Sequence, residues 1–266
     1  MYIERTNSTN TLLRELIAKG KWQAGEEYLY TGFQTAGRGQ SGNGWESEEG
    51  KNLLCSILLS HQPSEVSGVR PAFDLNVAVS VAVHRMVNSQ FSILHSQLTI
   101  KWPNDIYWQD KKIAGILVEN ALVGSKVRYS IAGIGLNVNQ TEWLSNAPNP
   151  VSMRQISGAE YDIHELMKTL MNEMHTVLAM KREEIWAYYR THLYRKDGFW
   201  PFVEREVSIA PTMNYSPSLE ERDGESLERP IFLAKIENIR ADGELELRDQ
   251  EGNLRLYHFK EVRYVL

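Results

Sequence analysis

The stretch KWPNDIYWQDKKIAGILVE, residues 101–119, decides how the rest of the chain is interpreted. A predicted strand over 97–102 ends at a Pro-Asn-Asp turn, a second turn carries paired lysines, and an apolar strand follows over 112–123. The stretch therefore brings together the amide of Asn104, the carboxylate of Asp105 and the ammonium of Lys112. Such a set of groups can bind a nucleotide and stabilise negative charge as it develops.

Two other features favour a site over a plain turn. A lysine beside a turn is usually only solvated, and Asn-Asp after proline is common turn chemistry. However, Gly115 follows Lys112 by three residues, which allows a ligand to approach the same strand closely. The segment GIGLNVN, residues 133–139, ends another strand with small residues and amides, and it is suited to a ligand that lies against backbone.

A glycine-rich loop, QTAGRGQSGNGW over residues 34–45, contains a G-x-G-x-x-G pattern. Dinucleotide binding would need a helix directly after the loop, and here an acidic stretch and a strand follow. A P-loop would need a closing Gly-Lys-Ser/Thr, which does not occur. Two interpretations stay open from the residues alone: a hairpin loop, or a ligand-binding loop in which Arg38 binds phosphate or carboxylate.

The pattern of apolar residues predicts an α/β chain that ends in a small β domain. The polar segment 212–229 reads as an insertion, and short apolar runs follow between turn signals such as Asp242-Gly243. Gly198 and Pro201 break the helical pattern before these runs, so domains over 1–202 and 203–266 are predicted. Helices are predicted over 8–19, 72–88, 163–180 and 182–195, and strands over 26–34, 52–60, 97–102, 112–123 and 127–138.

Composition excludes several classes of protein. The 266 residues carry a net charge of −5 and no block of Lys/Arg, so neither nucleic acid nor a membrane is expected as a partner. One cysteine, Cys55, lies in an apolar run and is expected to be buried, in keeping with the reducing cytoplasm. The seven histidines show no metal-ligand spacing, and no G-x-S-x-G elbow occurs.

Taken together, these motifs resemble the biotin protein ligases. Ser8-Thr9-Asn10 is similar to the family's Ser-Thr-Asn segment, the KWPND block with the Lys112-Ile-Ala-Gly115 run is similar to its signature block, and the resemblance extends over nearly the whole chain. It implies that Lys112 and Arg38 are catalytic and that Asp105 serves Mg²⁺. It implies a biotin site formed by Ser8, Thr9, Asn10, Gln34, Gly37, Arg38, Gly39, Gln40, Lys112, Gly115 and Gly133. It implies an ATP and adenylate site formed by Arg38, Trp45, Asn104, Asp105, Lys112, Leu136 and Asn137.

The same resemblance implies a fold and a reaction. The fold would be a mixed sheet with helices packed on it, as in class II aminoacyl-tRNA synthetases, followed by a small SH3-like β-barrel. Biotin and MgATP would give biotinyl-5′-AMP, and a lysine of a biotin carboxyl carrier protein domain would then accept the biotin. A cytoplasmic monomer or homodimer is expected. The alternatives are a lipoate or octanoate ligase or transferase of the same fold, and a protein that binds biotin without turnover.

Two departures from the family pattern matter. Gln40 and Asn43 stand where the family loop has arginines, which predicts weaker retention of the activated intermediate or compensation by a cation such as Lys51. Ser8 also lies close to Met1, so the resemblance predicts a monofunctional ligase with no preceding DNA-binding domain.

Overall fold

The computed structural model describes residues 1–39, 43–60, 72–91, 97–123, 126–145, 149–205 and 230–266. The chain folds as two units, Met1–Tyr194 and Arg195–Leu266. The sequence places the division after residue 202 on the strength of Gly198 and Pro201, whereas the strand β8 (Trp200–Glu204) already belongs to the second unit. The predicted insertion at 212–229 and the apolar run at 207–210 lie outside the described residues.

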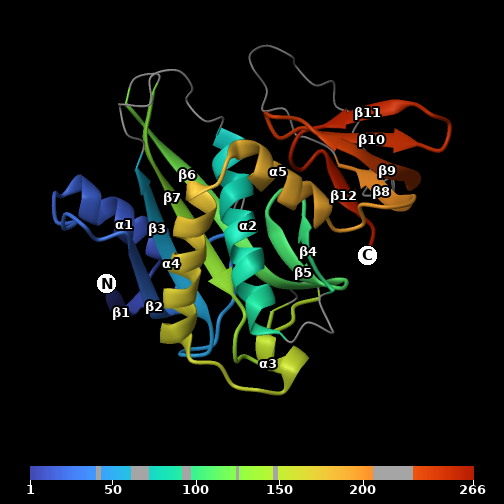
Figure 1. Ribbon diagram of the computed structural model, residues 1–266. Coiled ribbons are helices and arrows are strands. Elements are labelled where there is room, and N and C mark those ends of the chain that lie inside the picture. Colours follow the sequence, from blue (N-terminus) through green and yellow to red (C-terminus); the bar gives the residue numbers. More distant parts are fainter. Residues whose placement is uncertain (40–42, 61–71, 92–96, 124–125, 146–148, 206–229) are drawn as a thin grey trace, which may run out of the picture. The chain divides into compact units, whose positions relative to one another are not determined.

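The first unit is built on a seven-stranded mixed sheet with the order β1-β2-β3-β7-β6-β5-β4 (Figure 1). The β1–β2 pair is parallel, and the other neighbouring pairs are antiparallel. The strands are β1 (Tyr2–Thr6), β2 (Tyr28–Gln34), β3 (Leu53–Ser60), β4 (Leu98–Lys101), β5 (Asp105–Trp108), β6 (Lys111–Val123) and β7 (Lys126–Leu136). The mixed sheet is thus confirmed, while β1 and β5 were not predicted because both are short.

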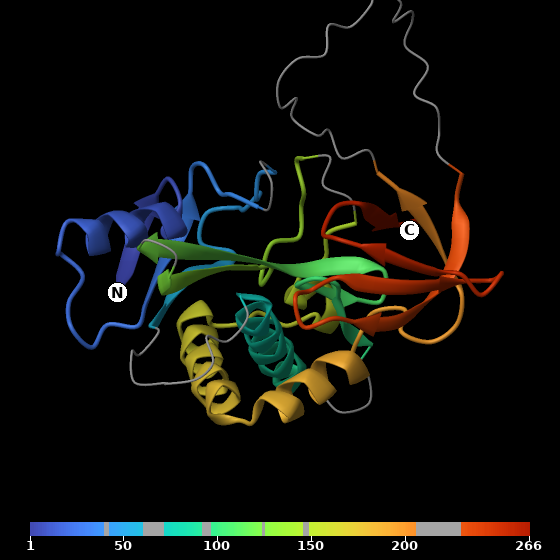
Figure 2. The same ribbon diagram turned by 90° about the horizontal axis from the view of Figure 1, so that it is seen from above.

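Helices cover both faces of this sheet, and Figure 2 shows α1 on one side with α2, α4 and α5 on the other. Their apolar stripes were visible in the sequence, and the predicted helices are confirmed with ends shifted by a few residues. The short α3, which begins with a Ser152–Gln155 capping box, was not predicted. The helices are α1 (Thr9–Ala18), α2 (Ala72–Gln90), α3 (Met153–Ser157), α4 (Ile163–Ala179) and α5 (Arg182–Thr191).

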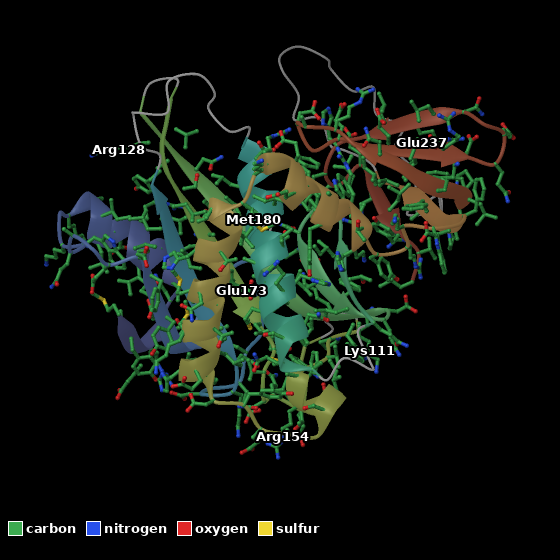
Figure 3. The ribbon with its side chains drawn as sticks, viewed as in Figure 1. Lys111, Arg128, Arg154, Glu173, Met180 and Glu237 are labelled. Carbon is green, nitrogen blue, oxygen red and sulfur yellow. The ribbon has the colours of Figure 1, made fainter. Side chains whose placement is uncertain are left out.

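Polar contacts join the three helices that share a face. Asp74 of α2 is 5% exposed, accepts two hydrogen bonds from Arg182 of α5 and accepts a third from the indole of Trp186. Arg85 of α2 pairs with Glu173 of α4 at 2.7 Å (Glu173 is labelled in Figure 3). These contacts fix the helices on the face opposite α1, and α1 lies against β2, β3 and β7.

The second unit is a five-stranded antiparallel sheet with the order β11-β10-β9-β8-β12. Besides β8 it contains β9 (Phe232–Ile239), β10 (Leu245–Asp249), β11 (Leu254–Tyr257) and β12 (Val262–Tyr264). Phe202, Ala234 and Leu247 are fully buried and form its core. The predicted small C-terminal β domain is confirmed.

Two remaining expectations concern Cys55 and membranes. Cys55 is buried, and burial raises the pKa of its thiol to about 12, so it behaves as a small apolar residue as predicted. Among the described residues, no helix combines the length and the apolar character needed to cross a bilayer.

Candidate functional site

A β-bulge turns Lys112 toward the face of the sheet that carries Gly115. Ile106 of β5 pairs with Ala114 of β6, but its neighbour Tyr107 pairs with Lys112, so β6 carries one extra residue at this point. Strict alternation would put positions 112 and 115 on opposite faces. Instead, the Lys112 Nζ lies only 3.2 Å from the place of a Cβ at Gly115. Bulges commonly re-aim a side chain in this way next to active sites.

The ammonium of Lys112 forms an ion pair with Asp105. Its Nζ lies 2.8 Å from Asp105 Oδ1, and the two side chains are 30% and 28% exposed. The same Nζ lies 5.6 Å from the ring of Trp45. The pair is therefore partly shielded from water yet open enough to meet a ligand, and it confirms that the Pro-Asn-Asp turn and the second lysine come together.

Two glycines make a flat floor for Trp45. A Cβ at Gly115 would lie 2.8 Å from the indole, and a Cβ at Gly135 would lie 2.4 Å from it. Gly115 and Gly135 are direct partners on β6 and β7, so their missing side chains leave one continuous gap on the sheet. The indole Nε1 is buried and, among the described residues, has no hydrogen-bond partner.

The segment 149–151 fixes the backbone of the lysine. The Lys112 N–H donates to the Asn149 carbonyl, and the Lys112 carbonyl accepts from the Val151 N–H. Asn137 is buried beside this contact and donates from Nδ2 to the Val151 carbonyl, while its Oδ1 has no partner among the described residues. The Oδ1 of Asn137 is thus an acceptor that lies close to β6, the strand that carries Lys112.

The start of α1 supplies a second group of polar side chains. Ser8 is the N-cap residue, although its side chain makes no capping hydrogen bond. Gln34, at the end of β2, accepts from both the backbone N–H and the hydroxyl of Thr9 through Oε1. The contact joins two predicted biotin-site residues that are 25 positions apart in the sequence.

Asn10 is locked in place over Gly133. The Oδ1 of Asn10 accepts from Ser56, and its Nδ2 donates to Glu119 at 2.7 Å. A Cβ at Gly133 would lie 2.4 Å from Asn10 Oδ1, so only glycine leaves room for this amide. Asn10 is 3% exposed, and its amide covers the sheet at Gly133.

The glycine-rich loop is a small hairpin that carries Arg38. The Trp45 N–H donates to the Gly37 carbonyl, Arg38 bridges to Gly44, and the Gly39 N–H donates to the Asn43 carbonyl. The described residues on either side of the loop pair as a hairpin does, which is compatible with both interpretations left open by the sequence, and Gln40 lies outside the described residues. Arg38 and Trp45 thus lie on the two paired segments of this hairpin, where Gly37 pairs with Trp45 and Arg38 with Gly44.

Arg38 is paired with Glu119 of β6. Its Nη2 lies 3.0 Å from Glu119 Oε2, and Arg14 of α1 lies 2.9 Å from Oε1. Burial alone would raise the pKa of Glu119, but the hydrogen bonds from Asn10 and Arg14 and the two positive charges outweigh it, so the pKa is lowered. Glu119 is therefore ionised at neutral pH.

Asn104 and Leu136 are buried in the scaffold of the site. Asn104 donates from Nδ2 to Asn76 of α2 and to the Ile116 carbonyl, which ties the turn before Asp105 to its neighbours. Leu136 is fully buried. Because both side chains are buried, Asn104 would act on a nucleotide by fixing the turn before Asp105, and Leu136 would contact a nucleotide through its backbone.

The comparisons with known proteins agree with this arrangement. The model of the biotin/lipoate A/B protein ligase family matches residues 2–137, a range that contains all the predicted site residues. The chain belongs to this family.

Related ligases match over most of this chain. The bifunctional ligase/repressor BirA of Bacillus spizizenii is 31% identical over 229 residues, which is 84% of this chain and 62% of that protein. The biotin–[acetyl-CoA-carboxylase] ligase of Mycobacterium tuberculosis is 29% identical over 174 residues, covering 65% of this chain and 61% of its own length. The chain thus spans about three fifths of the length of these relatives.

A solved structure shows the same fold. The biotin protein ligase from Aquifex aeolicus in complex with biotin and ATP aligns with 100% of this chain and 98% of its own, with a TM-score of 0.71 and 22% identity. The mixed sheet with packed helices and the C-terminal β domain are therefore those of the family's biotin protein ligases.

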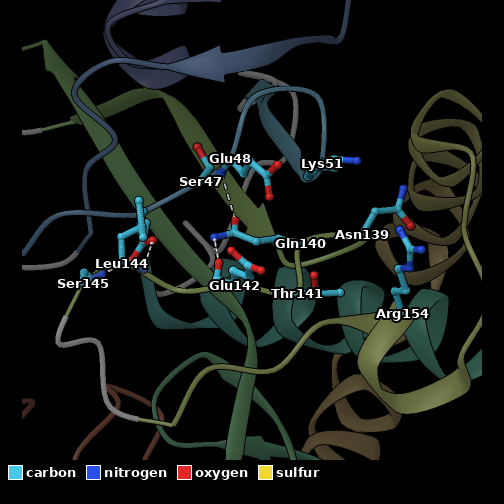
Figure 4. Close-up of a pocket in the computed structure, with 11 residues that line it drawn as sticks. Ser47, Glu48, Lys51, Asn139, Gln140, Thr141, Glu142, Leu144, Ser145 and Arg154 are labelled. Carbon is cyan, nitrogen blue, oxygen red and sulfur yellow. Dashed lines mark hydrogen bonds between the residues drawn. The ribbon is translucent and has the colours of Figure 1, made fainter.

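In this family member, a pocket is lined by residues that follow Trp45 and Asn137 in the sequence (Figure 4), and Lys112, Asp105 and Trp45 are not among its lining residues. Its lining residues include Glu46, which follows Trp45 directly, and Asn139, which lies two residues after Asn137. Lys51 lines it, and Glu46 closes one side by accepting the backbone N–H groups of Leu144 and Ser145. Figure 4 shows the side chains that line it, Ser47, Glu48, Lys51, Asn139, Gln140, Thr141, Glu142, Leu144, Ser145 and Arg154.

The residues thus fall into two groups on one face of the sheet. Lys112, Asp105 and Trp45 form the first group, and Asn10, Arg38 and Glu119 belong to the second. The part that sequence reasoning missed is Glu119, which ends the stretch quoted at the outset. The spacing could have indicated it, because every second residue of a strand lies on the same face, so Glu119 shares a face of β6 with Gly115 and Leu117.

Proposed function

We propose that the protein activates biotin with ATP to biotinyl-5′-AMP and transfers the biotin to a lysine of a biotin carboxyl carrier protein domain. The observation that carries the proposal is the Lys112–Asp105 pair at 2.8 Å, set over the Gly115–Gly135 floor of a biotin/lipoate ligase domain. The Mycobacterium tuberculosis relative, which is named a biotin–[acetyl-CoA-carboxylase] ligase, supports biotin over other acids.

In the first step, an oxygen of the biotin carboxylate attacks the α-phosphorus of ATP. A new P–O bond forms, the bond to the β-phosphate oxygen breaks, and pyrophosphate leaves. Negative charge builds on the phosphate oxygens, and the Lys112 ammonium can stabilise it as the ligands draw it away from Asp105. Loss of one such contact typically costs about 10²–10³ in rate.

In the second step, a lysine amine of the acceptor domain attacks the carbonyl of the mixed anhydride. An amide bond forms, AMP leaves with the electrons of the broken C–O bond, and the amine proton passes to solvent or to the departing phosphate. The Trp45 indole lies against Lys112 and, by covering the sheet, would keep water from the anhydride.

The polar group at the start of α1 would bind the ring of biotin. Thr9 and Gln34 already share a hydrogen bond, and Gln34 retains its amide donors for a ureido carbonyl. The Ser8 hydroxyl makes no capping hydrogen bond, and it would bind the same ring. Arg38 would bind the carboxylate or the phosphate by a bidentate contact.

Mg²⁺ would be held mostly by the phosphates. The described residues contain no cluster of three or more His, Cys, Asp or Glu side chains that could cage a metal ion. Mg²⁺ usually binds through one or two carboxylates together with substrate phosphates and water. Asp105 fits that single role, provided that Lys112 moves from it toward the reacting groups.

Two alternatives are separated by one experiment on the wild-type chain. ATP–pyrophosphate exchange is measured with biotin, lipoate and octanoate in parallel. We expect exchange with biotin only. Exchange with lipoate or octanoate instead would identify the other branch of the family, and binding of biotin without exchange would identify a non-catalytic binding protein. We propose that the protein acts in the cytoplasm and that it is a monomer or a homodimer.

A further inference from the structure

One carboxylate, that of Glu119, contacts both groups that the proposed biotin site needs in a fixed position. It accepts the Asn10 amide at 2.7 Å and pairs with Arg38 at 3.0 Å. These two residues come from distant parts of the chain, the start of α1 and the glycine-rich hairpin. Glu119 is their common partner on the rigid sheet.

The contact to Asn10 decides which way its amide points. Ser56 donates to Asn10 Oδ1 at 2.5 Å, and the carboxylate of Glu119 can only accept, so it fixes Nδ2 on its own side. A backbone contact to the Leu117 carbonyl at 3.4 Å is too long to replace it. Without the carboxylate, the amide over Gly133 would lose its charge-assisted bond.

The contact to Arg38 decides where the hairpin rests. Arg14 lies on the other oxygen of Glu119 at 2.9 Å, so the carboxylate separates two guanidinium groups. Without it, two positive charges would repel each other at short range. The lowered pKa of Glu119 agrees with a permanent negative charge at this point.

We propose that Glu119 is a positioning residue for biotin. It sets the orientation of the Asn10 amide, and it holds the Arg38 guanidinium in place before the ligand binds. The inference rests on the proposed function and adds to it a residue with no direct contact to the reacting atoms. The Asn10 amide and the Arg38 guanidinium are then already in place when biotin binds, which favours affinity.

A purely structural role fits the surroundings less well. The Glu119 side chain is 22% exposed, and its partners are the polar side chains of Asn10, Arg14 and Arg38. Its strand, β6, is paired with β7 over ten residue pairs, so removing one side-chain charge leaves the sheet intact. The effect should therefore be seen in biotin binding rather than in folding.

The test compares Glu119→Gln and Glu119→Ala in the full chain, with KM and kcat for biotin and ATP measured by ATP–pyrophosphate exchange. Gln keeps an acceptor for Asn10 but loses the charge that holds Arg38, whereas Ala loses both. We expect the KM for biotin to rise about tenfold with Gln and about 100-fold with Ala, the size of losing one and then two charge-assisted contacts. The KM for ATP and kcat should change less than about threefold, and Glu119→Asp should recover part of the affinity.

Glu15→Gln is the matched control, because Glu15 is an exposed carboxylate of α1 whose ion pair, within the described part of the chain, is with Lys19. It should leave all constants unchanged. Equal KM values for biotin in wild type and both Glu119 variants would overturn the positioning role while leaving the proposed function intact. A matching loss of folding stability in urea would also overturn it in favour of a structural role. A wild-type chain that neither binds nor exchanges biotin would overturn both proposals.

Discussion

At Gly133, the lack of a side chain decides what can lie on the sheet. Asn10 occupies the space that a Cβ would take, at 2.4 Å, and Glu119 and Ser56 hold its amide there. The glycine is thus required by close approach of a polar side chain rather than by backbone conformation. Gly135 does the same for Trp45.

We therefore expect Gly133→Ala to weaken biotin binding. The added methyl must push the Asn10 amide away from Glu119 and Ser56, because the sheet backbone cannot move. The KM for biotin should rise about 10–100-fold, which is the loss of one or two positioned hydrogen bonds, while the KM for ATP stays within about threefold. The measurement is ATP–pyrophosphate exchange at varied biotin.

The double variant Asn10→Ala/Gly133→Ala serves as the control. Removing the amide relieves the crowding, so folding stability should recover while the KM for biotin stays high. An unchanged KM in Gly133→Ala would show that the amide can shift at no cost, and the account of this floor would be wrong.

At the scale of elements, His84 joins α2 to its neighbours. Its Nε2–H donates to the Leu98 carbonyl of β4, and its Nδ1 accepts from the Tyr188 hydroxyl of α5, which is the arrangement of a neutral imidazole. Burial lowers the pKa of His84 to about 4, against the opposing effect of the Leu98 carbonyl and with help from His192. The charged form is therefore disfavoured in the folded protein.

This predicts a loss of stability in mild acid. The unfolded chain binds the proton near pH 6.5 and the folded protein only near pH 4, so the stabilisation is complete above 6.5 and is lost as pH falls through this window. The free energy of unfolding should drop by about 2 kcal/mol between pH 7 and 5 from this group. Urea unfolding at both pH values measures it.

His84→Gln should flatten that pH dependence by the same amount, and His175→Gln, which removes an exposed imidazole, should leave it steep. Identical pH dependence in wild type and His84→Gln would contradict the assignment of the buried neutral ring.

At the scale of the whole molecule, apolar pattern and segment length together predicted the long helices. The apolar stripe over 163–180 predicted α4, which buries one face. The apolar residues over 72–88 fit both a helix and an alternating strand, and the length of the segment decided for the helix that the structure shows as α2. β1 was missed because it is a five-residue edge strand whose parallel pairing with β2 joins residues 28 positions apart. The division after Tyr194 could not be predicted either, since it depends on which strands pair.

The site was predicted in part for the same reason. Lys112, Asp105 and Arg38 could be identified from the short sequence motifs that contain them. The structure places Lys112 beside Asp105. The bulge that turns Lys112, and the carboxylate of Glu119 that meets Asn10 and Arg38, arise from pairing between distant segments. No local pattern encodes such contacts, except the alternation along β6.

The most direct test of the central claim compares Lys112→Ala with Lys111→Ala in biotin-dependent ATP–pyrophosphate exchange. The two lysines are adjacent, but Lys111 is exposed at the start of β6 (labelled in Figure 3). We predict that Lys112→Ala lowers the exchange rate about 10²–10³-fold and that Lys111→Ala leaves it unchanged. Exchange at the wild-type rate in Lys112→Ala, or equal losses in both variants, would contradict the account.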